Sequence, residues 1–324
     1  MLKYPNFAHI ISVTLFPVSR SMQIVSSFSA LASHLRHTCR RVCLAVVCGH
    51  DVSTFEAVRR AVDEGIAEAV FVGSCSAVRA LWQSSCGSEP SGVSYVEAPD
   101  EAAAARAAVG LVRSGRASVL FKGLVHTSTL LRAVLDKQEG LLPEGAVLTH
   151  IAAAEVPGRE KMLFFSDAAV IPYPTQFQRE AQVGELAGLL HRLGVTEPRI
   201  ALNHCAETVS EKFPHTVGYA AIIRQAAEGR WGRLRVDGPL DLRTSLDPQC
   251  LATKGIVSVL EGRADALVLP DIETGNLLYK ALPLFAAAKV AGVLCGTLKP
   301  VVLPSRGDDA EAKYHSLLLA VFNA

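Results

Sequence analysis

The sequence predicts an α/β protein built on a parallel β-sheet with helices on both sides. Three observations support this fold class. Short apolar runs of the length expected for buried strands, such as residues 69–72, recur along the chain. Helical patterns separate these runs, which is the order of elements that places strands in parallel. With 324 residues, half of them apolar, the chain is long enough for two compact domains or one large unit.

In the first part of the chain, strand and helix signals alternate. Strands are predicted at residues 41–48, 69–72, around Tyr95 and at 117–121. Helices are predicted from the capping box Ser53-Thr-Phe-Glu56 to about residue 64, from about Ser76, after Pro99 and over residues 127–137.

After Gly140 the pattern changes, and residues 141–145 (LLPEG) are a predicted crossing point. Strands are predicted at residues 147–151, 162–165, 200–203 and 234–236, and helices over residues 176–193 and 215–228. Two more buried-strand candidates, ADALVLP (264–270) and PVVLP (300–304), flank a helix-like stretch that opens at Gly275-Asn276.

These last two strand candidates end in polar side chains. Asp271, Asn276 and Lys280 follow the first, and Ser305 and Arg306 follow the second. Ligands of open α/β sheets bind at the carboxyl ends of strands. The set therefore suits an anionic substrate.

Composition excludes several classes of function. The net charge of +1 argues against a nucleic-acid partner or a charged membrane surface. No apolar run approaches the roughly 20 residues of a membrane span. The eight cysteines form no CxxC pair and no zinc-type spacing. A reducing, cytoplasmic location fits this pattern, although SFSALAS near the N-terminus faintly resembles part of a secretion signal.

Several blocks of sequence, in order, resemble the phosphotransacetylase and phosphotransbutyrylase family of phosphate acyltransferases. They are FKGLVHTSTLLRAVLDKQEGL, LTHIAAAEVPG, FFSDAAVIPYPT, RIALNHCAETVSEKFPHT, DGPLDL and ATKGIVSVLEGRADALVLPDIETGNLLYK. The resemblance covers the chain from about Met22 to its end, and the GNLLYK and ETVSEKFPHT forms are closest to the butyryl branch. Residues 1–21 would then be a non-structural N-terminal extension.

The resemblance implies a fold similar to isocitrate and isopropylmalate dehydrogenases, with the active site in a cleft between two domains. The first domain would comprise residues 22–142 and 292–324, and the second residues 143–291. The implied reaction converts butyryl-CoA, or a similar short-chain acyl-CoA, and phosphate into acyl phosphate and CoA. It needs no metal and no cofactor other than coenzyme A as substrate. The family also implies a homo-oligomer.

The implied catalytic residues are Ser305, Arg306 and Arg132. An arginine provides a planar fork that matches phosphate oxygens, and a serine hydroxyl can donate to phosphate or to an oxyanion. The alternative interpretation is a helix N-cap serine beside solvated arginines.

Substrate binding is implied for two helix starts. The residues are Thr127, Ser128 and Thr129 at the first, and Asp271, Gly275, Asn276 and Lys280 at the second. Free amides at a helix start attract phosphate, whereas the alternative is ordinary helix capping. Further candidates, Glu207, Lys212 and Thr216, match the butyryl-type block, and His204 is more simply a structural group.

Two positions depart from the family pattern. The aspartate expected seven residues after the serine in the acetyl branch is Ala312 here, which leaves Asp309 and Glu311 as possible bases, with Asp308 nearby. Arg243 replaces the usual acid after the GPLxL-type motif. The rival interpretations are a phosphate acetyltransferase and a non-catalytic binder of CoA or acyl phosphate. A dinucleotide dehydrogenase is disfavoured because no GxGxxG follows the first strand.

Overall fold

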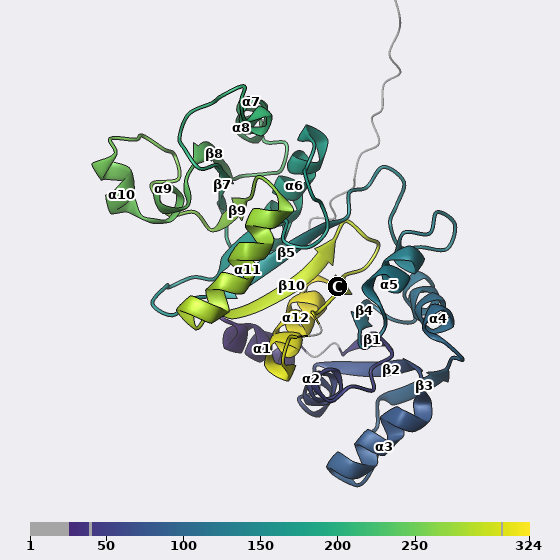
Figure 1. Cartoon of the computed structure of the whole chain (residues 1–324). Helices are drawn as coiled ribbons and strands as arrows, with labels where there is room; N and C mark the ends of the chain where they lie inside the picture. Colours follow the sequence, from purple (N-terminus) through teal and green to yellow (C-terminus); the bar gives the residue numbers. More distant parts are fainter. Residues whose placement is uncertain (1–25, 39–40, 306) are drawn as a thin grey trace, which may run out of the picture.

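The computed structural model describes residues 26–38, 41–305 and 307–324. In these residues eleven strands form one continuous sheet in the order β3-β2-β1-β4-β11-β10-β5-β6-β9-β7-β8 (Figure 1). The expected extension at residues 1–21 and the candidate Arg306 lie outside the described residues. No helix in the described part of the chain is long and apolar enough to cross a membrane.

The strands are β1 (Val42–Val47), β2 (Ala67–Gly73), β3 (Val93–Glu97), β4 (Val119–Lys122), β5 (Thr149–Glu155), β6 (Leu163–Ser166), β7 (Arg199–Asn203), β8 (Arg235–Leu240), β9 (Ala266–Val268), β10 (Lys289–Cys295) and β11 (Val301–Val302). The helices are α1 (Phe28–His37), α2 (Val52–Asp63), α3 (Cys75–Cys86), α4 (Glu101–Arg113), α5 (Thr127–Val134), α6 (Gln176–Arg192), α7 (Pro214–Val217), α8 (Tyr219–Ala227), α9 (Leu242–Leu246), α10 (Pro248–Thr253), α11 (Ile272–Ala286) and α12 (Ala310–Asn323).

The sheet is mostly parallel, but it has two halves that run in opposite directions. Strands β1 to β4 and β11 are parallel to one another, as are β6, β9, β7 and β8. Between them β10 and β5 pair antiparallel with each other and with their outer neighbours. The prediction of a parallel sheet is therefore correct for the two halves and wrong for the centre, because apolar periodicity does not encode strand direction.

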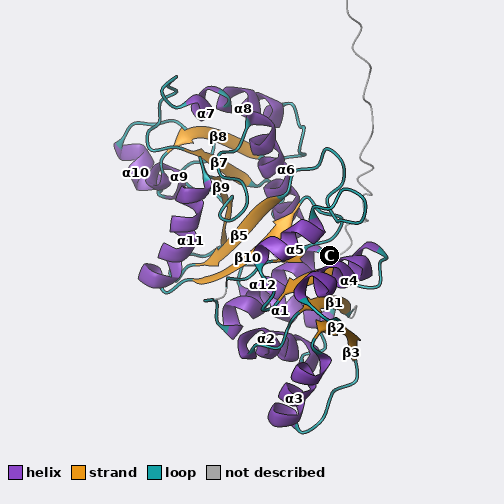
Figure 2. Ribbon diagram, turned by 45° about the vertical axis from the view of Figure 1, so that its right-hand side comes forward, coloured by secondary structure: helices purple, strands orange, loops and turns teal. Residues whose placement is uncertain are grey.

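Helices cover both faces of the sheet (Figure 2). One face carries α1, α2, α3, α6, α8 and α12, whose buried side chains form a single cluster with the strands beneath them. The other face has two separate clusters, one under α4 and α5 and one under α10 and α11. Figure 1 shows α11 and α5 on either side of β10. The helical cover of this face is thus interrupted near the middle of the sheet.

Two helix starts differ from their predictions. The N-cap of α2 is Asp51, whose carboxylate accepts a 2.9 Å bond from the Thr54 amide, so the predicted capping box at Ser53 is wrong. Helix α11 begins at Ile272 with Asp271 as its N-cap, three residues before the predicted Gly275-Asn276 opening. In both cases a nearer aspartate supplies the cap, because its carboxylate reaches the first free amides.

Two predicted helices have different lengths. Helix α5 ends at Val134 rather than at residue 137, because the Asp136 carboxylate instead accepts the amides of the following turn. The predicted helix over residues 215–228 is divided at Gly218 into α7 and α8. The remaining predicted strands and helices are confirmed, with shifts of a few residues at their ends.

Candidate active site

A pocket of about 250 Å³ lies near the interruption in the helical cover. Segments far apart in the sequence form its wall: the start of α5, strand β5, helix α11 and the loop between β11 and α12. Its lining includes Thr127, His150, Ala168, Ala169, Asn276, Tyr279, Lys280, Gly292, Leu303, Ser305, Asp308 and Ser316. Four sequence-predicted site residues, Thr127, Asn276, Lys280 and Ser305, are therefore brought together.

Beside this pocket, strand β10 extends past its pairing with the short strand β11. Leu294 and Val301 are the register pair between β10 and the short strand β11. Two residues earlier, the amide of Gly292 donates a 3.0 Å bond to the hydroxyl of Ser316 on α12. The backbone of β10 is thus satisfied by a helix side chain, and Gly292 and Ser316 both line the pocket.

Ser305 stands in a tight turn after β11. Its amide donates a 2.8 Å bond to the Asp308 carboxylate, and its hydroxyl oxygen accepts a 3.3 Å bond from the Gly307 amide. The side chain is exposed and borders both the pocket and a neighbouring hollow of about 470 Å³. Lys122 and Lys313 also line that hollow. The serine hydroxyl can therefore reach a ligand in either space.

Helix α5 begins at the pocket with its first residue, Thr127. The N-cap His126 makes no side-chain bond to the helix, and its imidazole pairs instead with Glu101 at 2.8 Å. The Glu101 carboxylate also accepts the His126 amide at 3.0 Å, and the His126 carbonyl accepts the Thr129 amide at 3.0 Å. The amides of Thr127 and Ser128 are then the ones at this helix start that suit an anion. Ser128 is exposed beside Thr127.

Arg132 and Thr129 lie elsewhere. They line a separate hollow of about 380 Å³ between α4 and α5, together with Arg106 and Glu139. Arg132 is exposed. It is five residues along the helix from Thr127, a rise of about 7.5 Å. Arg132, a sequence-predicted catalytic residue, thus does not line the pocket that contains Ser305.

The α11 candidates have different positions. The carboxylate of Asp271 is occupied as an N-cap, accepting 2.8 Å bonds from the amide and hydroxyl of Thr274. Gly275 packs against the backbone of Asp167, where a Cβ atom would lie 2.0 Å from the carbonyl oxygen. This close approach holds α11 near the pocket. Asn276 donates a 3.2 Å bond to the carbonyl of Ala168, and Lys280, one turn later on the same side of the helix, is exposed.

Neither of the two suggested bases lines the pocket, although Asp309 lines the neighbouring hollow that Ser305 also borders. The Asp309 carboxylate caps α12 by accepting the Ala312 amide at 2.8 Å. Glu311 lies 3.8 Å from Lys289 and 3.7 Å from His315. Asp308 does line the pocket, and burial raises the pKa of its carboxyl above the ordinary value. Of these three acids, Asp308 is the one that accepts a hydrogen bond from the Ser305 amide.

Three pocket residues with titratable side chains were not among the sequence-predicted site residues: His150, Tyr279 and Asp308. His150 follows Thr149 at the start of β5, before the apolar residues 151–154, and it is 6% exposed. A titratable side chain directly before this apolar run was the signal available in the sequence. Burial also raises the pKa of the Tyr279 hydroxyl, and the nearby Asp308 adds to the increase.

Comparison with known proteins identifies the family. The model of the family described as "Phosphate acetyl/butaryl transferase" matches residues 97–321. The chain belongs to this family. It is 35% identical over 281 residues to a phosphate butyryltransferase of Clostridium acetobutylicum, covering 87% of this chain and 93% of that protein.

Two further relatives agree with this result. A phosphate acetyltransferase of Thermotoga maritima is 33% identical over 86% of this chain and 94% of its own length. The crystal structure of a branched-chain phosphotransacylase from Enterococcus faecalis V583 superposes with a TM-score of 0.76 at 32% identity, covering 87% of this chain and 98% of that one. Members named for acyl transfer to phosphate thus match almost the whole chain.

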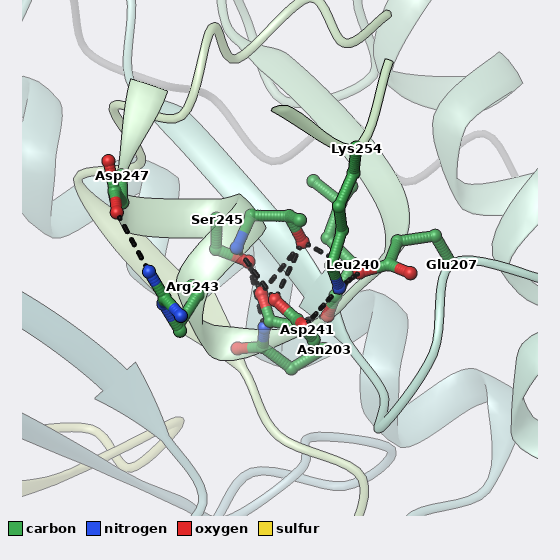
Figure 3. A network of polar contacts seen from close by, with 9 residues as sticks. Asn203, Glu207, Leu240, Asp241, Arg243, Ser245, Asp247 and Lys254 are labelled. Atoms are coloured by element: carbon green, nitrogen blue, oxygen red, sulfur yellow. Dashed lines mark hydrogen bonds and ion pairs between the residues drawn. The ribbon is translucent and has the colours of Figure 1, made fainter. Parts of the chain in front are cut away.

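With the family known, the residues of the butyryl-type block can be placed. Glu207 belongs to a polar network beyond β7 and β8 (Figure 3). Its carboxylate lies 2.8 Å from the Lys254 ammonium, which also pairs with Asp241 at 2.7 Å. Burial raises the pKa of the Asp241 carboxyl, but hydrogen bonds from Lys254 and Thr244 outweigh this and lower the pKa to about 2. This network ties α9 and α10 to the end of β7.

Other residues of that block have local partners. The Thr216 hydroxyl bonds the carbonyls of Ser210 and Phe213, so it closes a loop. His204 lies 3.2 Å from the ring of His215, which agrees with a structural group. Lys212 is exposed.

Arg243, the departure from the family pattern, is 75% exposed and lies 3.6 Å from Asp247. Figure 3 shows its side chain on the opposite side of the network from Lys254. The basic group is therefore not inserted among the acids at this position.

Proposed function

We propose that the chain is a phosphate butyryltransferase-type enzyme. It interconverts butyryl-CoA, or a similar short-chain acyl-CoA, and phosphate with acyl phosphate and CoA. The observation that carries this proposal is the convergence of Thr127, Lys280 and Ser305 around one pocket in a member of this family. Thr127 precedes Lys280 by more than a hundred residues, and strands β10 and β11 separate Lys280 from Ser305.

The reaction divides into two changes of bonding. A phosphate oxygen attacks the carbonyl carbon of the thioester, and the carbonyl electron pair moves onto oxygen. When the carbonyl re-forms, the carbon–sulfur bond breaks and coenzyme A leaves as a thiolate, which then takes a proton. The protein has to hold a dianion, stabilise an oxyanion and exclude competing water.

The pocket contains groups for each of these tasks. The open start of α5 and the Lys280 ammonium suit the phosphate, and the Ser305 hydroxyl can donate to phosphate or to the carbonyl oxygen. Arg306, whose family role is phosphate binding, follows Ser305 directly in the sequence. Ala168, Ala169 and Leu303 give the pocket an apolar side that suits a short acyl chain.

Several further features of the protein are part of this proposal. The fold would be that of the isocitrate and isopropylmalate dehydrogenases, with the pocket in a cleft between domains comprising residues 22–142 with 292–324 and residues 143–291. The sheet runs through this boundary by way of β10. Coenzyme A would act as a substrate in the cytoplasm, with no other cofactor.

We also propose a homo-oligomer, at least a dimer. The outer side of α11 supports this, because Leu277, Leu284 and Phe285 are 71–83% exposed. Large apolar side chains gathered on one side of a helix are typical of a contact surface. Size-exclusion chromatography with light scattering tests this, and Phe285→Glu should shift an oligomer toward the monomer.

A panel of acyl-CoA substrates tests the function. Release of free thiol should depend on added phosphate and should be fastest with butyryl-CoA or a neighbouring short chain. Fastest release from acetyl-CoA would instead indicate the acetyltransferase. Binding of CoA without any thiol release would indicate the non-catalytic binder.

A further inference from the structure

A buried histidine lies beside the residues of the proposed reaction. His150 is in strand β5, followed on the same face of the sheet by Ala152 and Ala154, which pack in the core under α11. Its side chain is 6% exposed and lines the pocket that contains Ser305 and Lys280.

The imidazole is not satisfied by its surroundings. Its Nδ1 atom is enclosed and has no hydrogen-bond partner among the described residues. The nearest carboxylate, Asp167, is taken up by backbone amides and a hydroxyl: it accepts bonds of 2.8–2.9 Å from the amides of His150, Ala169 and Val170 and from the Thr149 hydroxyl. The ring of Tyr279 meets the imidazole edge-on, with 6.1 Å between ring centroids. A buried polar group without a partner is rare, and it commonly marks a functional role.

The Nε2 edge of the His150 ring occupies space left by the missing side chain of Gly292. A Cβ atom at Gly292 would lie 2.3 Å from His150 Nε2 and 2.9 Å from Cε1, and His150 supplies all three of its nearest atoms. Glycine at this position therefore gives room to the imidazole, and the Nε2 edge faces the part of the pocket lined by Gly292. Orphaned buried acceptors are tolerated better than orphaned donors. The favoured neutral tautomer thus leaves Nδ1 bare and carries its proton on Nε2.

The imidazole is neutral under ordinary conditions. Burial lowers the pKa of His150, and the negative charge of Asp167 opposes this only in part. A neutral imidazole is a hydrogen-bond donor with no net charge. It can polarise a carbonyl without transferring its proton.

We propose that His150 is a catalytic residue whose Nε2–H donates a hydrogen bond to the acyl carbonyl oxygen as that oxygen becomes an oxyanion. This deepens the function proposed above and rests on it. As phosphate adds to the carbonyl carbon, the electron pair that moves onto oxygen is stabilised by this donor. When the pair returns and the carbon–sulfur bond breaks, the bond to Nε2–H weakens again, and the proton stays on His150 throughout.

The test compares three variants with the unmodified chain in the phosphate-dependent thiol-release assay. His150→Leu removes the donor and fills the space. Since one oxyanion donor contributes about 100- to 1000-fold to kcat, we expect a loss in this range with KM for acyl-CoA changed less than about threefold. His150→Gln retains an N–H donor and should stay within about tenfold of the unmodified chain. His191→Leu is the matched control and should be fully active, because this histidine lies outside the pocket and its ring bonds the Arg233 carbonyl.

Thermal unfolding separates catalysis from packing. His150→Leu replaces an unpaired buried polar ring by an apolar side chain, so its Tm should equal or exceed that of the unmodified chain. Gly292→Ala gives a second measurement, because it displaces the ring without removing it, and we expect it to lower kcat more than it changes KM.

Each result has a defined meaning. An unmodified chain without phosphate-dependent thiol release overturns the proposed function and the role of His150 together. An active unmodified chain with an equally active His150→Leu variant overturns the role of His150 alone. The same holds if a folded His150→Gln is as inactive as His150→Leu, if His150→Leu loses activity only in proportion to a large fall in Tm, or if Gly292→Ala leaves kcat unchanged.

Discussion

Ser305 and Asp308 close the turn between β11 and α12, with the Ser305 amide donating a 2.8 Å bond to the Asp308 carboxylate. Both residues line the pocket. A half-buried carboxylate therefore helps to fix the position of the serine proposed to act on the substrate. A change that weakens the bond between Ser305 and Asp308 should therefore alter both the stability of this loop and the position of Ser305 in the pocket.

Asp308→Asn should make the loop more tolerant of high pH. Burial raises the pKa of Asp308 above its ordinary value of 3.8 in the folded protein. The contribution of this group to stability is therefore fully present below pH 3.8 and is lost as the pH rises through the raised pKa. Asparagine keeps an oxygen acceptor for the Ser305 amide and carries no charge. We expect Tm at pH 7 to rise by up to about 3 °C.

Thermal melts of both proteins between pH 4 and pH 8 measure this difference. The two curves should approach each other toward pH 4. A variant that is less stable at pH 7 than the unmodified protein would show that the charged form of Asp308 stabilises the turn. Asp63→Asn, in an exposed ion pair on α2, is a suitable control.

The acids after Ser305 should contribute little to proton transfer. The thiol of coenzyme A resembles free cysteine, with a pKa of about 8.5, so a few per cent is thiolate at neutral pH without a base. Asp309→Ala and Glu311→Ala should each cost less than about tenfold in kcat, and the same expectation applies to Asp308→Asn. Asp309→Ala should also lose about 1 kcal/mol of stability, because it removes the α12 cap. A hundredfold fall in kcat with a shifted pH profile and an intact fold would identify a dedicated base.

Arg132→Ala should affect the binding of acyl-CoA more than the chemical step. Arg132 lines the hollow between α4 and α5, apart from the Ser305 pocket, where it can meet a remote phosphate of coenzyme A. We expect KM for acyl-CoA to rise about tenfold, which corresponds to about 1.4 kcal/mol, with kcat within about threefold. Steady-state kinetics with Lys280→Ala in parallel distinguishes the two regions. If kcat falls and KM does not change, Arg132 acts at the reacting group.

Arg306→Ala should damage phosphate handling more than folding. An arginine fork on a charged ligand contributes about 2–4 kcal/mol, so kcat/KM should fall roughly 30- to 1000-fold. Arg306→Lys keeps the charge and loses the fork, and its activity should be intermediate. A loss below about threefold, or a much lower Tm for Arg306→Ala, would indicate a structural role.

Local sequence patterns predicted much of the fold. Apolar runs located strands such as β1 and β2, and the Thr175 capping box fits the predicted start of α6 at Gln176. Strand direction was not predictable in the same way, because β5 and β10 are as apolar as the parallel strands and differ only in how the chain enters them.

The candidate site was predictable in part. Ser305 and Lys280 follow strands and carry the chemistry expected of an anion site, and they do line one pocket. The separation of Arg132 from them depends on which side of α5 faces α4. The place of the His150 ring in the pocket depends on the room left by the missing side chain of Gly292. These are properties of packing between distant segments, which no local pattern contains.

The most direct test of the account is phosphate-dependent thiol release from butyryl-CoA by the purified chain and by Ser305→Ala. We expect rapid release by the unmodified chain, none without phosphate, and at least about a 30-fold lower kcat for Ser305→Ala with an unchanged Tm. Release that is absent with every acyl-CoA, or equally fast in the two proteins, would contradict it.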